Sequence, residues 1–254
     1  METDNHALPL VLLGGTLCNA RLWQPVLARL NLSAVICPRL TADTSAEQAS
    51  QRLLEQLPPR FLLAGFSLGA IVALQMVADA PGRIAGLALL SVNPLADRPD
   101  NDTLRREAVN VARQQGLTTW LSASLWPKYV APSRVDDQAL QDLICRMAEE
   151  SGLDSLVTQT EIAITRRDNR RALAALACPI IIINGVHDPI CTPHHHQLAA
   201  QSAPQARCVT LAAAGHFTLL EVPDEVAPPL GQWIQEGSNA EKQTQGDARK
   251  QRHY

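Results

Sequence analysis

The fold is decided by residues 61–80, which read FLLAGFSLGAIVALQMVADA. The apolar run FLLA predicts a buried strand, and the apolar residues from Leu68 onward predict a long helix. Between them lies GFSLG, residues 65–69. A sharp strand-to-helix turn of this kind exposes a serine hydroxyl, and the flanking glycines leave room for the strained backbone. The pattern therefore favours a nucleophile at Ser67 over a serine that only caps the helix.

Short apolar runs alternate with amphipathic helical patterns on both sides of this stretch. Strands are expected at residues 8–13, 33–37, 60–64, 84–92, 179–184 and 206–211. Helices are expected at residues 21–30, 45–57 and 68–80, the second of them capped by Ser45 or Thr44. Continuous apolar strands separated by helices are typical of a parallel sheet covered on both faces. We therefore predict an α/β fold with a mostly parallel sheet of about six strands, formed by residues 1–96 and 171–236.

Residues 97–170 have a different pattern, because they contain helical periodicities but no strand candidate. They predict a helical lid inserted after the fourth strand, and the alternative is an extra helical layer without a gating role. A last helix is expected at residues 223–236, broken or kinked at Pro228-Pro229. Residues 237–254 hold no Val, Ile, Leu, Met, Phe or Trp, so a disordered tail is predicted there.

The composition narrows the classes of partner. The chain has 254 residues, and its 22 Lys and Arg against 25 Asp and Glu give a net charge of -3, so neither nucleic acid nor a membrane surface is expected as a partner. No apolar run approaches the roughly 18 residues of a membrane span, and residues 1–6 do not resemble a signal peptide. Six cysteines without a C-x-x-C pair are expected to be reduced. A cytoplasmic protein with a small-molecule partner is predicted, and its oligomeric state is left open.

A serine nucleophile needs a general base, and the base needs an acid to orient it. Asp188 follows the strand expected at 179–184, and His216 follows the strand expected at 206–211. The carboxyl ends of parallel strands share one edge of the sheet, so both side chains are expected near Ser67. We predict Ser67 as nucleophile, His216 as base and Asp188 as acid. The alternatives are an Asp-Pro turn at Asp188, a helix cap at His216, and Asp97 as the acid.

Two main-chain N–H groups are the predicted oxyanion donors. The loop after the first strand reads Gly14-Gly15-Thr16, and it points to the N–H of Thr16 together with that of Leu68, the residue after the nucleophile. A glycine pair can also form a phosphate cradle. No G-x-G-x-x-G or G-K-[ST] motif is present, so no nucleotide cofactor is expected.

Several other residues suggest weaker hypotheses. The run His194-His195-His196 could suggest a zinc site. Successive residues of a helix point about 100° apart, however, so a solvated helix start is favoured. No metal and no cofactor are expected. Cys18 and Cys191 are expected in loops near the site, but neither follows a strand-to-helix turn of the kind that carries Ser67, so neither is favoured as the nucleophile. Arg166-Arg167 could bind a substrate carboxylate, yet Asp168 beside them favours a solvated ion pair.

Aromatic residues are scarce in this chain, and three of them, Trp120, Trp126 and Tyr129, fall in the predicted lid. We predict that Trp120 and Trp126 line the apolar side of the lid that covers the substrate. Packing of the lid against the sheet explains the same residues equally well.

Four segments carry a family resemblance, namely residues 14–16, residues 65–69, Gly185 with Asp188, and Gly215-His216. The sequence resembles the α/β-hydrolase superfamily over residues 8–233, in particular the lid-bearing group of carboxylesterases, enol-lactonases and C–C bond hydrolases. Three features depart from the family pattern. Gly14-Gly15 replaces the usual His-Gly, residues 37–41 replace the D-x-x-G-x-G loop, and the leading antiparallel hairpin is missing.

The residues and the resemblance together imply a cofactor-free serine hydrolase. We expect it to cleave a small or medium carboxylic ester or lactone through an acyl-enzyme on Ser67. The alternatives are thioester or C–C bond hydrolysis by the same three residues, and a non-catalytic ligand-binding protein. The presence of all three residues argues against the last alternative.

Overall fold

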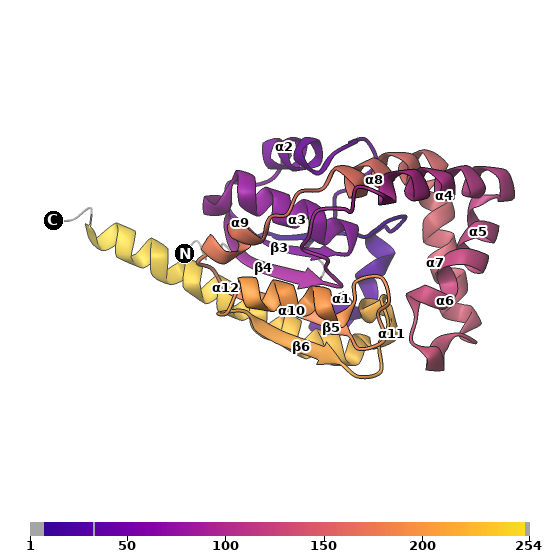
Figure 1. Ribbon diagram of the computed structural model, residues 1–254. Helices are drawn as coiled ribbons and strands as arrows, with labels where there is room; N and C mark the ends of the chain where they lie inside the picture. The colour runs from indigo at the N-terminus through magenta and orange to yellow at the C-terminus, as the bar shows by residue number, and fades with distance from the viewer. Residues whose placement is uncertain (1–7, 33, 252–254) are drawn as a thin grey trace.

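A computed structural model describes residues 8–32 and 34–251 of the chain, with side chains as far as residue 243. One six-stranded sheet forms its centre (Figure 1). The strands are β1 (Leu10–Leu13), β2 (Val35–Ile36), β3 (Phe61–Phe66), β4 (Ile84–Leu90), β5 (Ile180–Gly185) and β6 (Arg207–Leu211). Every pair is parallel, and the order is β2-β1-β3-β4-β5-β6. The prediction of about six mostly parallel strands is confirmed.

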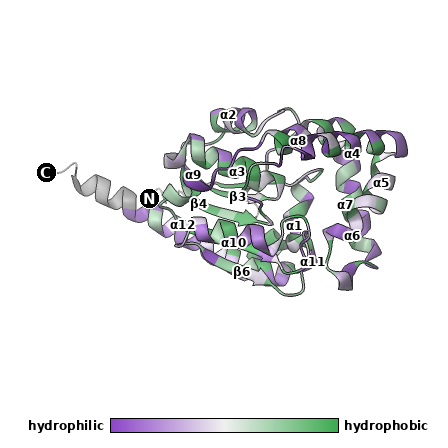
Figure 2. Cartoon of the chain, viewed as in Figure 1, coloured by the Kyte–Doolittle hydropathy of each residue, from purple (hydrophilic) through white to green (hydrophobic). Residues whose placement is uncertain are grey.

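Helices cover both faces of the sheet because alternate strand residues point to opposite sides. Leu12 packs in an apolar layer with α1 (Gln24–Leu30), α11 (Thr218–Glu221) and α12 (Pro223–Gln251). Leu13 packs in the opposite layer with α2 (Ala46–Gln56), α3 (Leu68–Asp79), α9 (Arg170–Ala175) and α10 (Pro193–Ser202). Hydrophobic residues accordingly dominate β3, β4 and α3 (Figure 2). Of the two predicted caps of α2, the structure selects Ser45, whose hydroxyl accepts from the N–H of Gln48 at 3.1 Å.

An α-helical insertion separates β4 from β5. It contains α4 (Asn101–Gln115), α5 (Leu117–Trp120), a π-helical segment (Leu121–Leu125), α6 (Trp126–Tyr129), α7 (Gln138–Ser151) and α8 (Leu153–Thr165). The strand arrows point toward these helices, so the insertion lies beyond the carboxyl edge of the sheet (Figure 1). This is the edge at which ligands bind in open parallel sheets.

The C-terminal segment differs from its prediction. Disorder was expected at residues 237–254, but α12 continues from Pro223 to Gln251 and includes Pro228 and Pro229. Gly237 packs so closely on Leu62 that an added Cβ would collide with it, and Arg60 forms an ion pair with Glu241. A helix already anchored on the sheet gains one hydrogen bond for each residue it adds, so it extends without large apolar side chains. Residues 252–254 lie outside the described part of the chain.

Two further expectations can be compared with the structure. No helix within the described residues is long and apolar enough to cross a membrane. All six cysteines are free thiols.

Candidate active site

The turn at Ser67 has the strained geometry that its sequence predicts. Ser67 joins β3 to α3 with φ of 52° and ψ of -111°, a left-handed φ that is rare for residues other than glycine. A Cβ at Gly69 would collide with the main chain of Leu13, and one at Gly65 would collide with the main chain of Gly69. The two glycines therefore allow β3, α3 and the end of β1 to approach closely, and the approach holds Ser67 in its strained conformation.

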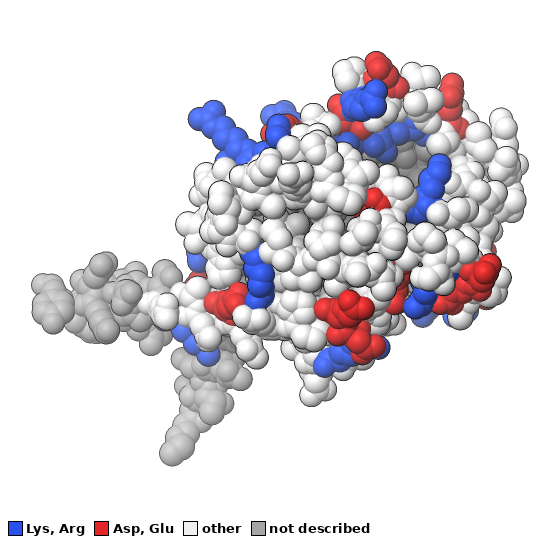
Figure 3. Space-filling model, turned by 60° about the horizontal axis from the view of Figure 1, so that its bottom comes forward, with Lys and Arg blue, Asp and Glu red and all other residues white. Residues whose placement is uncertain are grey.

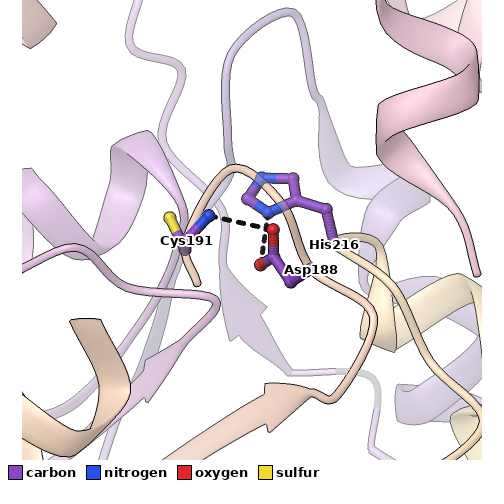
Figure 4. Close-up of side chains that lie close together, drawn as sticks. All are labelled: Asp188, Cys191 and His216. Carbon is purple, nitrogen blue, oxygen red and sulfur yellow. Dashed lines mark hydrogen bonds and ion pairs between the residues drawn. The ribbon is translucent and has the colours of Figure 1, made fainter. Parts of the chain in front are cut away.

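The structure brings Ser67, His216 and Asp188 into one hydrogen-bonded chain. Nε2 of His216 lies 2.9 Å from Oγ of Ser67, and its Nδ1 lies 2.8 Å from Oδ2 of Asp188. Oδ1 of Asp188 accepts from the N–H group of Ile190 at 2.8 Å. It also accepts from that of Cys191 at 2.9 Å (Figure 4). Because these bonds fix the carboxylate, Oδ2 favours the imidazole tautomer protonated at Nδ1, which leaves the Nε2 lone pair facing the serine.

The loop that carries His216 is fastened by groups that the sequence analysis missed. Oγ of Ser91, at the end of β4, donates to the carbonyl of His216 at 2.7 Å. The carboxylate of Glu221 accepts from the N–H of Gly215 at 3.0 Å and from that of Ala131, in the insertion, at 2.7 Å. Burial raises the pKa of Glu221, although these N–H groups oppose the rise. A lone acid in the apolar run FTLLEV, residues 217–222, is the sequence signal that could have revealed this role.

The loop that is predicted to bind the oxyanion is also held in place by a residue far along the chain. Within the described chain, the main-chain N–H groups of Thr16 and Leu68 have no hydrogen-bond partner, so both are free to bind an oxyanion. The next N–H, that of Leu17, donates to Oε1 of Gln159 on α8 at 2.8 Å. The amide of Gln159 in turn donates to the carbonyl of Leu40 at 2.8 Å. Gln159 is buried and positions the loop, a role that periodicity along α8 did not reveal.

Two cavities of about 210 Å³ and 120 Å³ both have Ser67 in their walls. The larger one is mainly apolar and extends between the sheet edge and the insertion, where the surface view shows a hollow (Figure 3). Trp120 and Tyr129 line it. Trp126 does not, because its buried indole donates to the carbonyl of Val135 at 2.9 Å inside the insertion. The structure thus places one of the two predicted aromatic residues at the cavity.

Arg166 differs from the expectation of a solvated ion pair with its neighbour. It is buried, its Nη2 lies 3.0 Å from Asp97, and it also donates to the carbonyls of Leu95 and Ala163. Asp97 further binds Arg105 at 2.6 Å. Burial of Asp97 opposes ionisation, but its hydrogen bonds and the arginine charges prevail and lower its pKa. Asp97, the alternative acid, therefore contacts arginines rather than His216.

Asp188, Cys191 and His216 offer ligand atoms within 4.8 Å of one another, which resembles a metal site (Figure 4). Asp188 and His216 already bind each other, and burial raises the pKa of the Cys191 thiol well above its usual value. A metal ion would have to displace both a hydrogen bond and a tightly held proton. Burial likewise raises the pKa of Cys18 to about 12, so neither thiol is an activated nucleophile.

The three consecutive histidines at the start of α10 occupy different environments. His194 is exposed, and Nδ1 of His195 accepts from the N–H of Thr192 at 3.1 Å. His196 is buried beneath the site, close to Asp188, Cys191 and His216. The expectation of a solvated run was wrong for this residue, because the helix turns its third histidine toward the sheet.

His196 should make the stability of the protein fall with acid. Burial lowers its pKa from 6.5 to about 4, with the charge of His216 acting in the same direction and that of Asp188 against it. Because the folded pKa lies below the unfolded one, stability is intact above pH 6.5 and is lost as the pH falls toward 4. The loss through this group alone is about 2 kcal/mol at pH 5. Urea unfolding at pH 8 and pH 5 measures it.

The matched variants for this test are His196→Leu and His194→Leu. His196→Leu should remove about 2 kcal/mol of the pH-dependent change in unfolding free energy, whereas His194→Leu should keep all of it. An identical pH dependence in wild type and His196→Leu would show that this histidine does not carry the effect.

Known proteins resemble this chain in sequence and in fold. A family model described as the alpha/beta hydrolase family matches residues 10–228. The chain is 28% identical to a pimeloyl-[acyl-carrier protein] methyl ester esterase of Nitrosomonas europaea, over 89% of this chain and 95% of that protein. A thermophilic esterase from Thermogutta terrifontis superposes with a TM-score of 0.82 at 23% identity, covering 91% of this chain and 90% of that one. The enol-lactonase of Burkholderia xenovorans gives 0.75 at 20% identity, covering 90% and 92%. At these identities the two solved structures establish the fold.

Proposed function

The chain belongs to the alpha/beta hydrolase family and is a carboxylic ester hydrolase, and from this premise we propose that it cleaves a small or medium ester or lactone through an acyl-enzyme on Ser67. One observation carries the proposal. The hydrogen-bonded chain Ser67–His216–Asp188 opens into a mainly apolar cavity of about 210 Å³. Such a cavity suits a short acyl chain, and the three side chains supply nucleophile, base and acid.

In the first half of the proposed reaction, Oγ of Ser67 attacks the ester carbonyl while Nε2 of His216 accepts its proton. The carbonyl oxygen becomes an oxyanion, and the free N–H groups of Thr16 and Leu68 bind it. Asp188 stabilises the imidazolium through Nδ1 and remains ionised. When the intermediate collapses, the C–O bond to the alcohol breaks and His216 returns the proton to that oxygen.

In the second half, water attacks the acyl-enzyme and the same groups act again. His216 accepts a proton from the water, the oxyanion forms at the same two donors, and the acid product leaves as the proton returns to Oγ of Ser67. With a lactone, the alcohol and acid belong to one product molecule. A methyl ester, as in the name of the Nitrosomonas relative, falls within the proposed class.

We also propose that residues 97–170 act as a lid. The cavity lies between this insertion and the sheet edge, and residues of α4, α5 and α8 line it. Closing such an insertion over the substrate would exclude water from the attack on the ester.

Fluorophosphonate labelling tests the serine mechanism. The reagent should modify one serine, which peptide mass mapping identifies as Ser67, and a panel of ester, thioester and β-diketone substrates should show the ester as the best substrate. Labelling at another serine would contradict the assignment of Ser67. Cleavage of the diketone alone would favour C–C bond hydrolysis, and binding without turnover of any substrate would favour a ligand-binding protein.

A further inference from the structure

Arg105 lies on α4 and lines both cavities that contain Ser67. We propose that its guanidinium forms a carboxylate-binding subsite, so that the preferred ester carries a second, free carboxylate. This inference rests on the proposed function, because it names the substrate class of the same site. It combines three observations, namely open hydrogen-bond donors, an uncompensated positive charge, and cavity walls without an acidic side chain.

Arg105 uses only part of its hydrogen-bonding capacity within the protein. Nε donates to Oδ2 of Asp97 at 2.6 Å, and Nη2 donates to Oδ1 at 3.2 Å. A guanidinium carries five N–H groups, and the other N–H groups of Arg105 have no partner among the described residues. Its side chain is 36% exposed, so these donors can reach a ligand. Asp97 thus fixes one edge of the guanidinium and leaves the rest available.

The charges around Arg105 favour an anion. Asp97 is shared by two arginines, Arg105 and Arg166, so the three side chains together carry a net positive charge. Arg166 is buried, binds Asp97 and two carbonyls, and lines only the smaller cavity. Arg105 is more exposed and lines both cavities, so it is the better placed of the two to bind a ligand. No Asp or Glu of the described chain lines either cavity. The larger cavity is mainly apolar, and in such surroundings a net positive charge attracts an anion more strongly than it would in water.

A carboxylate is the anion that matches this donor. Two N–H groups of a guanidinium lie parallel and bind both oxygens of a carboxylate, and the bonds are stronger because both partners are charged. The competing interpretation is that Arg105 and Asp97 form a purely structural pair between α4 and the segment after β4. In that case the loss of Arg105 would affect neutral and anionic substrates equally.

Matched ester pairs separate the two interpretations. On the acyl side, p-nitrophenyl hemi-esters of dicarboxylic acids with six to eight carbons are compared with p-nitrophenyl esters of monocarboxylic acids of equal length. On the alcohol side, carboxymethyl hexanoate is compared with ethyl hexanoate. For at least one of these pairs, the wild type should have a higher kcat/KM for the ester that carries a free carboxylate than for its neutral partner. Arg105→Gln should lower kcat/KM for that substrate by about 10- to 100-fold, mainly through KM, the range of a lost charge-assisted hydrogen bond. It should change the neutral ester by less than about threefold.

Two further variants control for folding and charge. Arg105→Lys keeps the charge without the planar fork and should fall between wild type and Arg105→Gln. Arg106→Gln removes the neighbouring arginine, which pairs with Glu161 and lines neither cavity, and it should keep the wild-type preference. Circular dichroism and melting temperature establish that each variant is folded. Should Arg105→Gln fail to fold, the test uses inhibitors of wild type and Arg105→Lys. Adipate should inhibit competitively, whereas adipamide, the neutral diamide of equal length, should not.

The inference is overturned if the wild type prefers the carboxylate ester in neither pair. It is also overturned if Arg105→Gln lowers kcat/KM equally for both members of a pair, or if Arg106→Gln lowers it for the carboxylate ester as much as Arg105→Gln does. Failure of the proposed function is distinguishable, since it would appear as absence of Ser67-dependent turnover on the neutral esters themselves.

Discussion

Ser67→Ala lowers kcat for hydrolysis of p-nitrophenyl hexanoate by about 10⁴- to 10⁶-fold, the usual cost of removing a triad nucleophile. The expected loss is large because no other serine or thiol in the described chain has the same position at the strand-to-helix turn. The alanine variant keeps the N–H groups of Thr16 and Leu68 and the cavity, so a small residual rate is expected. Initial rates of ester hydrolysis, measured with purified protein at saturating ester, give kcat.

The fold should survive this change, since among the described residues the side chain of Ser67 makes one hydrogen bond, to Nε2 of His216. The melting temperature should therefore stay close to that of the wild type. Ser202→Ala is the matched control and should keep full activity, because within the described residues the hydroxyl of Ser202 bonds only the carbonyl of Leu198 on α10. Near-wild-type turnover by folded Ser67→Ala would refute the assignment of the nucleophile.

Asp188→Asn lowers kcat by about 10⁴-fold on the same ester. Oδ1 of Asp188 accepts two main-chain N–H groups, so in the variant the amide oxygen should take that place and the NH₂ group should face Nδ1 of His216. An N–H donor there favours the tautomer protonated at Nε2, which cannot accept the serine proton. The effect is expected in kcat, with the melting temperature measured in parallel.

Asp97→Asn provides the comparison, because Asp97 was the alternative acid. Its carboxylate binds Arg105 and Arg166, so its loss should disturb the insertion but lower kcat far less than Asp188→Asn does. A larger kcat loss in Asp97→Asn than in Asp188→Asn would reverse the assignment of the acid.

Most of the fold could be predicted because its signals are local. The strand and helix of residues 61–80 and the continuous apolar strands are patterns that a window of a dozen residues contains. The chain order of Ser67, Asp188 and His216, each after a strand, was enough to predict their proximity, since parallel strands deliver their carboxyl ends to one edge. The hydrogen bonds of 2.9 Å and 2.8 Å agree with that prediction.

The partners of single side chains could not be predicted in the same way. Gln159 and Glu221 looked like ordinary polar residues, yet one binds the loop at Leu17, 142 residues earlier, and the other joins Gly215 to Ala131. Their roles depend on which main-chain groups the fold leaves unpaired beside them. That information is absent from any local window.

The sequence by itself thus determined the order of strands and helices along the chain, the strained turn at Ser67, and the choice of Ser67, Asp188 and His216 as neighbours. Each of these follows from backbone geometry and periodicity along the chain. Only the tertiary structure decided that Arg166 and His196 are buried, that Trp126 turns away from the cavity, and that Arg105 faces it with open donors. Burial and pairing depend on distant segments that pack together, and the free energy of a charged or polar group depends on those neighbours rather than on its position in the sequence.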